Sequence, residues 1–207
     1  MKILAIIGAR PQFVKAAVVS RAIVVQNGRG GERIDEVLVH TGQHYNDNMS
    51  AIFFCEREIP ECNYNLGICD GSHGGMNGRM FKQIEPALLR VRPEVVLDCG
   101  DTRSTPAGAL AAVKQYIPAA HVEAELRFFD INTSWEINLI LTDRISEFLF
   151  CPTHMTSTTN LRRVCCVNGA ERNPASAERK IDVFIIAGAK IIEAVYCGAF
   201  VAAGGYA

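Results

Sequence analysis

The sequence predicts an α/β fold: a Rossmann-like open parallel sheet with helices on both faces. Short apolar runs alternate with longer stretches of helical periodicity, in the order that builds successive strand–helix units. The runs are apolar at consecutive positions, which indicates strands buried on both faces, as in a parallel sheet covered by helices. This alternation is typical of doubly wound α/β domains.

Individual elements follow from the same pattern. The predicted strands are Ile3–Ile7, Glu36–His40, Val95–Asp98, Ala119–Val122 and Phe148–Cys151. The predicted helices are Phe13–Gln26, Gly78–Arg90, Ala107–Tyr116 and Ser134–Ser146. The periodicity weakens around 152–180, where Asn168-Gly169 and Asn173-Pro174 favour a linker. A further strand–turn–helix unit is predicted over Val183–Tyr196.

Composition limits the class of protein. The chain has 207 residues, 49% of them hydrophobic and 21% charged, with a formal net charge of -1, so a sizeable core is expected. Without a long run of charge, nothing indicates a nucleic-acid partner or a membrane surface. The apolar start ends at Gly8, too early for a signal peptide, and we expect a cytoplasmic protein. The cysteines form no C-x-x-C pair, so we expect reduced thiols and no metal site.

Polar residues follow the predicted strands. Arg10 comes after the first strand, Gln43 and His44 after the second, Asp101 after the next, and Glu123 after the one that follows. Because the carboxyl ends of parallel strands meet at one edge, this set predicts a nucleotide or phosphorylated-sugar site. The first turn lacks G-x-G-x-x-G and the chain has no P-loop, so dinucleotide binding and P-loop hydrolysis are disfavoured.

Some of these residues have simpler interpretations. The segment Gly71–Gly75 either presents backbone N–H groups to an anion or is a flexible loop, in which His73 bonds to its own neighbours. Asp101 either acts chemically or caps the following helix. Glu123 is harder to explain away, since a carboxylate at a strand end needs solvent or a partner.

Several motifs resemble the non-hydrolysing UDP-N-acetylglucosamine 2-epimerases. They are Ile7–Lys15, Thr41–Tyr45, Gly71–Gly74, Gly100–Thr102, Ala107–Ala112, His121–Ala124 and Cys151–Thr153. The similarity runs from Met1 to about Arg163 and returns at Gly188–Val195. It implies the glycosyltransferase-B arrangement of two Rossmann-like domains across a cleft. We therefore expect a first domain at 1–165, a linker at 166–180, and at 181–207 the first unit of an otherwise missing second domain.

The resemblance implies a reaction. The family eliminates UDP across C1–C2 and adds it back with the proton on the other face, which needs a base, an acid and cations for the diphosphate. Asp101 and Glu123 match the acid/base carboxylates, and Arg10 and Lys15 match the basic residues near the diphosphate. The resemblance implies no metal or redox cofactor, and it implies a homodimer in cell-envelope polysaccharide biosynthesis.

Further positions are assigned by the same resemblance. Glu136 lies in the segment that normally reads Pro-Glu-Glu-x-Asn-Arg, and we assign it as a third catalytic carboxylate. His73 and Arg127 are assigned to substrate binding. Gln43 and His44 fall where bacterial members bind a second, regulatory UDP-N-acetylglucosamine.

The chain also departs from the family pattern. Trp135 stands at an essential glutamate, Leu139 at its arginine partner, and Glu125 at a glycine. Trp135 is interpreted either as a lost acid/base group or as a core residue of a rebuilt helix face. We expect the isolated chain to be inactive or strongly impaired as an epimerase. The alternatives are a nucleotide-sugar-binding module without turnover and a degenerate fragment.

Overall fold

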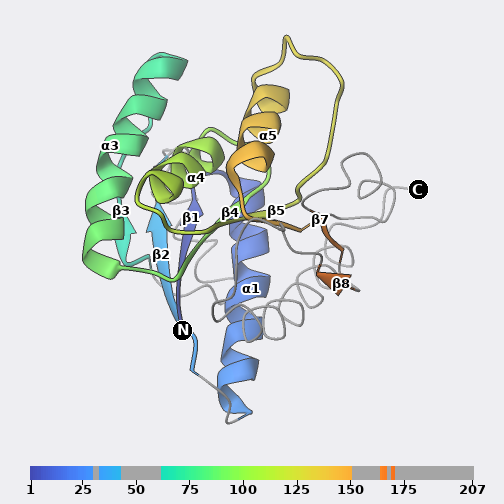
Figure 1. Ribbon diagram of the computed structural model, residues 1–207. Helices are drawn as coiled ribbons and strands as arrows, with labels where there is room; N and C mark the ends of the chain where they lie inside the picture. Colours follow the sequence, from blue (N-terminus) through green and yellow to red (C-terminus); the bar gives the residue numbers. More distant parts are fainter. Residues whose placement is uncertain (30–32, 43–61, 151–163, 167–168, 171–207) are drawn as a thin grey trace.

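The computed structural model describes residues 1–29, 33–42, 62–150, 164–166 and 169–170 (Figure 1). Gln43, His44, the unit predicted over Val183–Tyr196 and most of the predicted linker lie outside the described residues. The division into two domains therefore stays a prediction.

A single sheet organises the described chain. Its strands are β1 (Lys2–Ile7), β2 (Asp35–His40), β3 (Tyr64–Asn65), β4 (Val95–Cys99), β5 (Ala119–Val122), β6 (Phe148–Phe150), β7 (Val164–Cys166) and β8 (Gly169–Ala170). They lie in the order β3-β2-β1-β4-β5-β6-β7-β8, and all neighbours are parallel except β7 and β8. The predicted open parallel sheet is confirmed. Three short strands, β3, β7 and β8, were not predicted, and β8 falls inside the predicted linker.

Helices cover both faces of this sheet (Figure 1). They are α1 (Arg10–Gly28), α3 (His73–Val91), α4 (Ser104–Lys114) and α5 (Ser134–Ile145). Alternate residues of β1 separate into two cores: Ile3 and Ile7 pack with α1, whereas Leu4 and Ile6 pack with α3 and α4. Helix α5 packs beside α4. Burial on both faces explains why the strands read as continuous apolar runs. None of the helices in the described part of the chain is long and apolar enough to cross a membrane.

The start of α3 corrects the sequence analysis. The helix begins at His73 rather than at Gly78, so Gly74 and Gly75 belong to its first turn and not to a flexible loop. Ser72 caps it, since its Oγ accepts a hydrogen bond from the Gly75 N–H at 3.2 Å. The prediction placed the start too late because glycine has a low helix propensity, which a good cap offsets.

Candidate functional site

The chain changes direction across the sheet between β1 and β4. From β1 it continues to β2 and β3 on one side, and from β4 to β5 and β6 on the other. The loops after β1 and β4 therefore diverge at the carboxyl edge, and such a switch point is where open α/β sheets bind ligands. Arg10 begins α1 here, and Asp101 and Glu123 follow β4 and β5.

Lys15 and Glu123 form an ion pair at this edge. Their side chains are 15% and 31% exposed, so the pair is partly buried but still reached by solvent. Gly100 packs against both groups: a Cβ at this position would lie 3.3 Å from Lys15 Nζ and 3.4 Å from Glu123 Oε2. The structure thus brings Lys15 and Glu123 together beside the residue that precedes Asp101.

The backbone at Glu123 has a conformation that L-residues rarely adopt, with φ of 69°. Two hydrogen bonds hold it there, because the N–H groups of Glu123 and Ala124 both donate to the Phe150 carbonyl, at 3.0 and 3.1 Å. Strained residues of this kind cluster at functional sites, where surrounding contacts maintain them. The turn fixes the direction in which the Glu123 carboxylate leaves β5.

Gln12 connects the loop after β1 to the end of β4. Its side chain is fully buried; Oε1 accepts from the N–H groups of Gly8 and Ala9, at 2.7 and 2.9 Å, and Nε2 donates to the Cys99 carbonyl at 2.7 Å. No role was predicted for this residue. The available signal was its place at the third helical position after Ala9, where Gln or Glu commonly bonds back to the helix start.

Hydroxyl groups extend the Gln12 contacts to the loop of Asp101. Ser104 Oγ donates to Gln12 Oε1 at 3.1 Å, Thr105 Oγ1 donates to the Cys99 carbonyl at 3.0 Å, and Thr102 Oγ1 lies 2.7 Å from Ser104 Oγ. We call Gln12, Thr102, Ser104 and Thr105 the neutral cluster. It joins the loop 100–103 to the start of α1 and itself contains no charged group.

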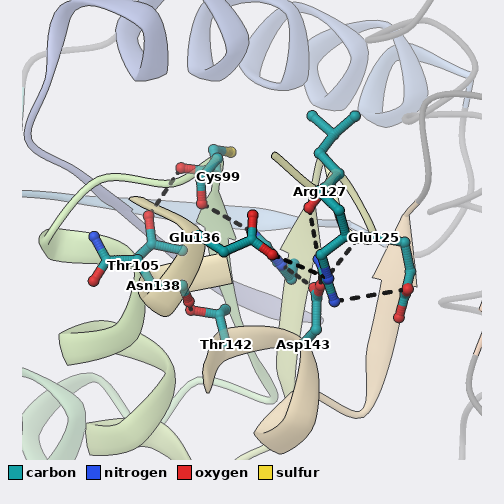
Figure 2. A network of polar contacts seen from close by, with 11 residues as sticks. Cys99, Thr105, Glu125, Arg127, Glu136, Asn138, Thr142 and Asp143 are labelled. Atoms are coloured by element: carbon teal, nitrogen blue, oxygen red, sulfur yellow. Dashed lines mark hydrogen bonds and ion pairs between the residues drawn. The ribbon is translucent and has the colours of Figure 1, made fainter. Parts of the chain in front are cut away.

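A second, charged network surrounds Asp143 of α5 (Figure 2). Asp143 Oδ1 lies 2.6 Å from His121 Nδ1, and Oδ2 accepts from the Glu125 N–H at 3.0 Å and from Arg127 Nη1 at 2.7 Å. His121 Nε2 donates to the Gly100 carbonyl at 2.9 Å. His121 and Asp143 are buried, so this network ties the loop after β5 to the loop after β4 through the protein interior.

Glu136 and Asn138 complete the charged network from the first turns of α5. Glu136 is 3% exposed; its Oε2 accepts from the Phe128 N–H at 2.7 Å, and its Oε1 lies 4.0 Å from Arg127 Nε. Asn138 Nδ2 donates to the Asp101 carbonyl oxygen at 2.7 Å. We call His121, Glu125, Arg127, Glu136, Asn138 and Asp143 the charged network. It positions the main chain on both sides of the candidate site.

Comparison with known proteins identifies the family. The sequence profile of the UDP-N-acetylglucosamine 2-epimerases matches residues 27–166. The chain belongs to this family. The resemblance stated from the motifs is therefore confirmed, and the family is one of isomerases.

Individual relatives support the assignment. A UDP-2,3-diacetamido-2,3-dideoxy-D-glucuronate 2-epimerase of Pseudomonas aeruginosa is 50% identical over 183 residues, covering 88% of this chain and 49% of the relative. A UDP-N-acetylglucosamine 2-epimerase of Methanocaldococcus jannaschii is 46% identical over 162 residues, 78% of this chain and 43% of the relative. This chain therefore spans about half the length of the curated relatives it matches.

Solved structures agree with the fold. The crystal structure of the Methanocaldococcus jannaschii 2-epimerase, in complex with UDP-GlcNAc and UDP, matches with a TM-score of 0.73 and 42% identity. The match covers 81% of this chain and 46% of that one. The 2-epimerase of Neisseria meningitidis, bound to UDP-GlcNAc, matches with a TM-score of 0.68 at 28% identity. The predicted fold class, the first domain of a glycosyltransferase-B-type protein, is confirmed.

The predicted site residues of this 2-epimerase family member fall into different surroundings. Lys15 and Glu123 pair at the switch point, and Asp101 lies in the adjoining loop after β4. Arg127 contacts Asp143 and lies 3.7 Å from Glu125 and 4.0 Å from Glu136, so its guanidinium is engaged inside the protein.

Other assigned residues are not brought to the Lys15–Glu123 pair. His73 is exposed at the start of α3, and no described contact joins it to the pair. The Arg10 side chain, Gln43 and His44 lie outside the described residues. The interpretation of Asp101 as a helix cap is wrong, because α4 has Arg103 at its N-cap position and no side-chain cap.

The departures from the family pattern are resolved in part. Leu139 is 1% exposed and belongs to the core, whereas Trp135 is 53% exposed, so the interpretation of Trp135 as a core residue is wrong. Glu125 is 5% exposed and has φ of 61°, a conformation that glycine adopts without strain. The glycine of the family's usual motif would suit this backbone better.

Burial changes the ionisation of two groups at the end of β4. It raises the pKa of the Asp98 carboxyl well above its ordinary value, and neither oxygen has a hydrogen-bond partner in the described structure. Burial raises the pKa of the Cys99 thiol to about 12. Cys99 is therefore protonated at neutral pH, and it is not a candidate nucleophile.

Proposed function

We propose that this chain binds a UDP-linked 2-acetamido sugar and forms the N-terminal half of a 2-epimerase site, with little or no turnover on its own. The observation that carries the proposal is the Lys15–Glu123 pair beside the Asp101 loop, at the topological switch point. A cation and carboxylates at this edge suit a ligand that combines a diphosphate with a sugar whose C2 proton must move.

Each residue has a proposed part in that chemistry. Glu123 and Asp101 would exchange protons with opposite faces of C2, as the elimination and re-addition of UDP require. Lys15 would face the departing diphosphate, with Arg10 contributing from the start of α1. Arg127 and Glu136, by contrast, are positioned to hold the loop 123–128 rather than to touch the sugar.

Turnover should be weak because two groups of the family pattern are changed. Trp135 cannot exchange a proton, and Leu139 cannot hold an anion; one acid/base group contributes about 10²–10⁴-fold to the rate. The chain also spans about half of its relatives, so a complete cleft would need a second domain supplied by residues 181–207 and beyond, or by another polypeptide. A degenerate fragment that binds nothing is the competing interpretation.

Further properties of the family belong to the same proposal. A regulatory UDP-N-acetylglucosamine would contact Gln43 and His44, and the protein would act as a homodimer in the cytoplasm, in cell-envelope polysaccharide biosynthesis. Two substrates are candidates: UDP-N-acetylglucosamine, and the UDP-linked diacetamido glucuronate named for the Pseudomonas relative. Both are UDP-linked sugars with an acetamido group on C2.

Calorimetric titration of the full chain with both UDP-sugars tests the proposal. We expect saturable binding of at least one of them, and Lys15→Met should weaken it about tenfold by removing a cation from the diphosphate. Lys114→Met is the matched control, because Lys114 is exposed in the last turn of α4, at the opposite edge of the sheet. A folded chain that binds neither sugar would favour the degenerate fragment.

A further inference from the structure

Helix α5 carries one stripe of side chains toward the protein interior. Asn138, Leu139 and Thr142 are 8%, 1% and 0% exposed. Trp135 belongs to the same stripe, because residues spaced three, four and seven apart share one face of a helix. It is nevertheless 53% exposed. Trp135 therefore lies on the inward-facing side of α5, but at the start of the helix, where the core no longer covers that side.

The contacts of Asn138 locate Trp135 relative to the candidate site. Asn138 Nδ2 reaches the main-chain oxygen of Asp101 at 2.7 Å, so this turn of α5 lies against the Asp101 loop. Trp135 is the next residue of the stripe toward the helix start, and helical side chains tilt in that direction. The helical phase and this tilt therefore direct the Trp135 side chain toward the carboxyl edge of the sheet, on the side of the Asp101 loop.

The chemistry of the position suits a sugar ring. A half-exposed indole offers a large flat apolar face at the rim of a site that otherwise contains Lys15, Asp101 and Glu123. Such faces pack against planar or C–H-rich surfaces of ligands. Since Asp101 is assigned to the C2 carbon, the ligand part nearest to Trp135 is the pyranose and not the uracil.

We propose that Trp135 is a binding residue that stacks on the apolar face of the 2-acetamido pyranose of the UDP-sugar. The inference rests on the proposed function, since it needs the sugar beside Asp101. At this position the family has an acid/base carboxylate, and this chain has an aromatic ring instead. The substitution removes a group that would transfer a proton and adds a surface that would strengthen the binding of the sugar.

Trp135 is the chain's single tryptophan, so intrinsic tryptophan fluorescence reports on this position alone. We would titrate the full chain with UDP-N-acetylglucosamine and, separately, with UDP, and follow each titration by emission and by calorimetry. We expect a saturable emission change with UDP-N-acetylglucosamine at the calorimetric midpoint, and a much smaller change with UDP.

Variants separate stacking from a general loss of fold. Trp135→Ala should weaken the binding of UDP-N-acetylglucosamine about tenfold, which is in the range of one aromatic stacking contact. It should change the affinity for UDP by less than about twofold. Trp135→Phe should keep most of the affinity. The control is Tyr116→Ala, because Tyr116 is 97% exposed just after α4 ends, at the opposite edge of the sheet. This substitution should leave the affinity for both ligands unchanged.

The outcomes distinguish this inference from the function on which it rests. Calorimetric binding without an emission change, an equal emission response to UDP alone, or an equal loss for both ligands in Trp135→Ala would overturn stacking on the pyranose while leaving the binding function intact. A chain that binds no UDP-sugar by calorimetry would overturn both.

Discussion

Two loops at the same edge of the sheet differ in the contacts that hold them, because only the loop after β4 contacts the neutral cluster. The loop 100–103 after β4 is joined to α1 by the neutral cluster around Gln12, whose amide uses its oxygen and its nitrogen together. The Gly100 and Asp101 carbonyls of this loop also accept hydrogen bonds from His121 and Asn138 of the charged network. The loop 123–128 after β5 is fixed by the charged network around Asp143 and Arg127 (Figure 2). Both loops carry a carboxylate assigned to the reaction, Asp101 and Glu123.

The two sets of contacts differ in what they cost to bury and in what is lost when one member is removed. A buried neutral cluster costs little to desolvate, but each lost member leaves specific N–H or C=O groups unpaired. A buried charged network costs more to desolvate, and removing one partner strands a charge. We therefore predict a larger loss of stability when a member of the charged network is removed than when a member of the neutral cluster is removed.

The largest effect is expected for Asp143→Ala. The substitution leaves His121 and Arg127 facing each other without their shared carboxylate, and it should lower the free energy of unfolding by about 3–5 kcal/mol in chemical denaturation. The control is Asp35→Ala, which breaks the exposed Arg33–Asp35 pair and should cost less than about 1 kcal/mol. Similar costs for the two variants would contradict a buried network.

The second-largest effect is expected for Gln12→Ala, which should lower the free energy of unfolding by about 2–4 kcal/mol. The substitution leaves the N–H groups of Gly8 and Ala9 and the Cys99 carbonyl without the hydrogen bonds of the Gln12 amide. Gln12→Glu keeps an acceptor for both N–H groups, but it loses the donor to the Cys99 carbonyl and to Thr105 Oγ1 and buries an unpaired carboxyl group. It should therefore be destabilising as well, and more strongly at higher pH, where that carboxyl group would ionise. The same denaturation experiment measures both variants. A loss below about 1 kcal/mol for Gln12→Ala would contradict the role given to these hydrogen bonds.

Asp98 is an exception beside the neutral cluster, because it is a buried carboxyl with no hydrogen-bond partner among the residues that the structure describes. Its raised pKa means that the folded state holds the proton more tightly than the unfolded state, so stability should fall as pH rises above about 4. Asp98→Val should flatten that dependence and raise the free energy of unfolding at pH 7 by about 1–3 kcal/mol. Parallel pH profiles for the two proteins would refute this explanation.

The smallest effect is expected for Glu125→Gly, with a gain of about 1 kcal/mol. It relieves a positive φ and removes one of three carboxylates around Arg127, while giving up the contact at 3.7 Å. Ala124→Gly is the matched control; Ala124 has no positive φ, so this change should lower the melting temperature. A destabilised Glu125→Gly protein would show that the Arg127 contact outweighs the strain.

The sequence predicted the framework better than the support of the site. The strands that form the centre of the sheet, β1, β2, β4, β5 and β6, follow from apolar runs, because burial on both faces leaves a local signal. The bond from Gln12 to Cys99 joins residues 87 positions apart, and the contact of His121 with Asp143 spans 22. Such pairs depend on strand order and loop geometry, which periodicity does not encode.

Trp135 and Glu136 illustrate the same limit at neighbouring positions. Alignment to the family motif assigned Glu136 to catalysis and left Trp135 between two interpretations. In the structure, the Glu136 carboxylate accepts a hydrogen bond from the Phe128 N–H, whereas the Trp135 side chain is half-exposed. Helical phase places Trp135 on the inward-facing stripe, but only the tertiary structure shows where the core beneath that stripe ends.

The central claim is that this edge is preorganised for binding a UDP-sugar yet lacks competent turnover. It is tested most directly by incubating the folded chain with UDP-N-acetylglucosamine in heavy water and following the sugar's C2 proton by NMR. We predict a C2 signal that persists over hours while calorimetry shows the ligand bound. Loss of that signal at a rate proportional to protein concentration would contradict it and show that Asp101 and Glu123 suffice for proton exchange.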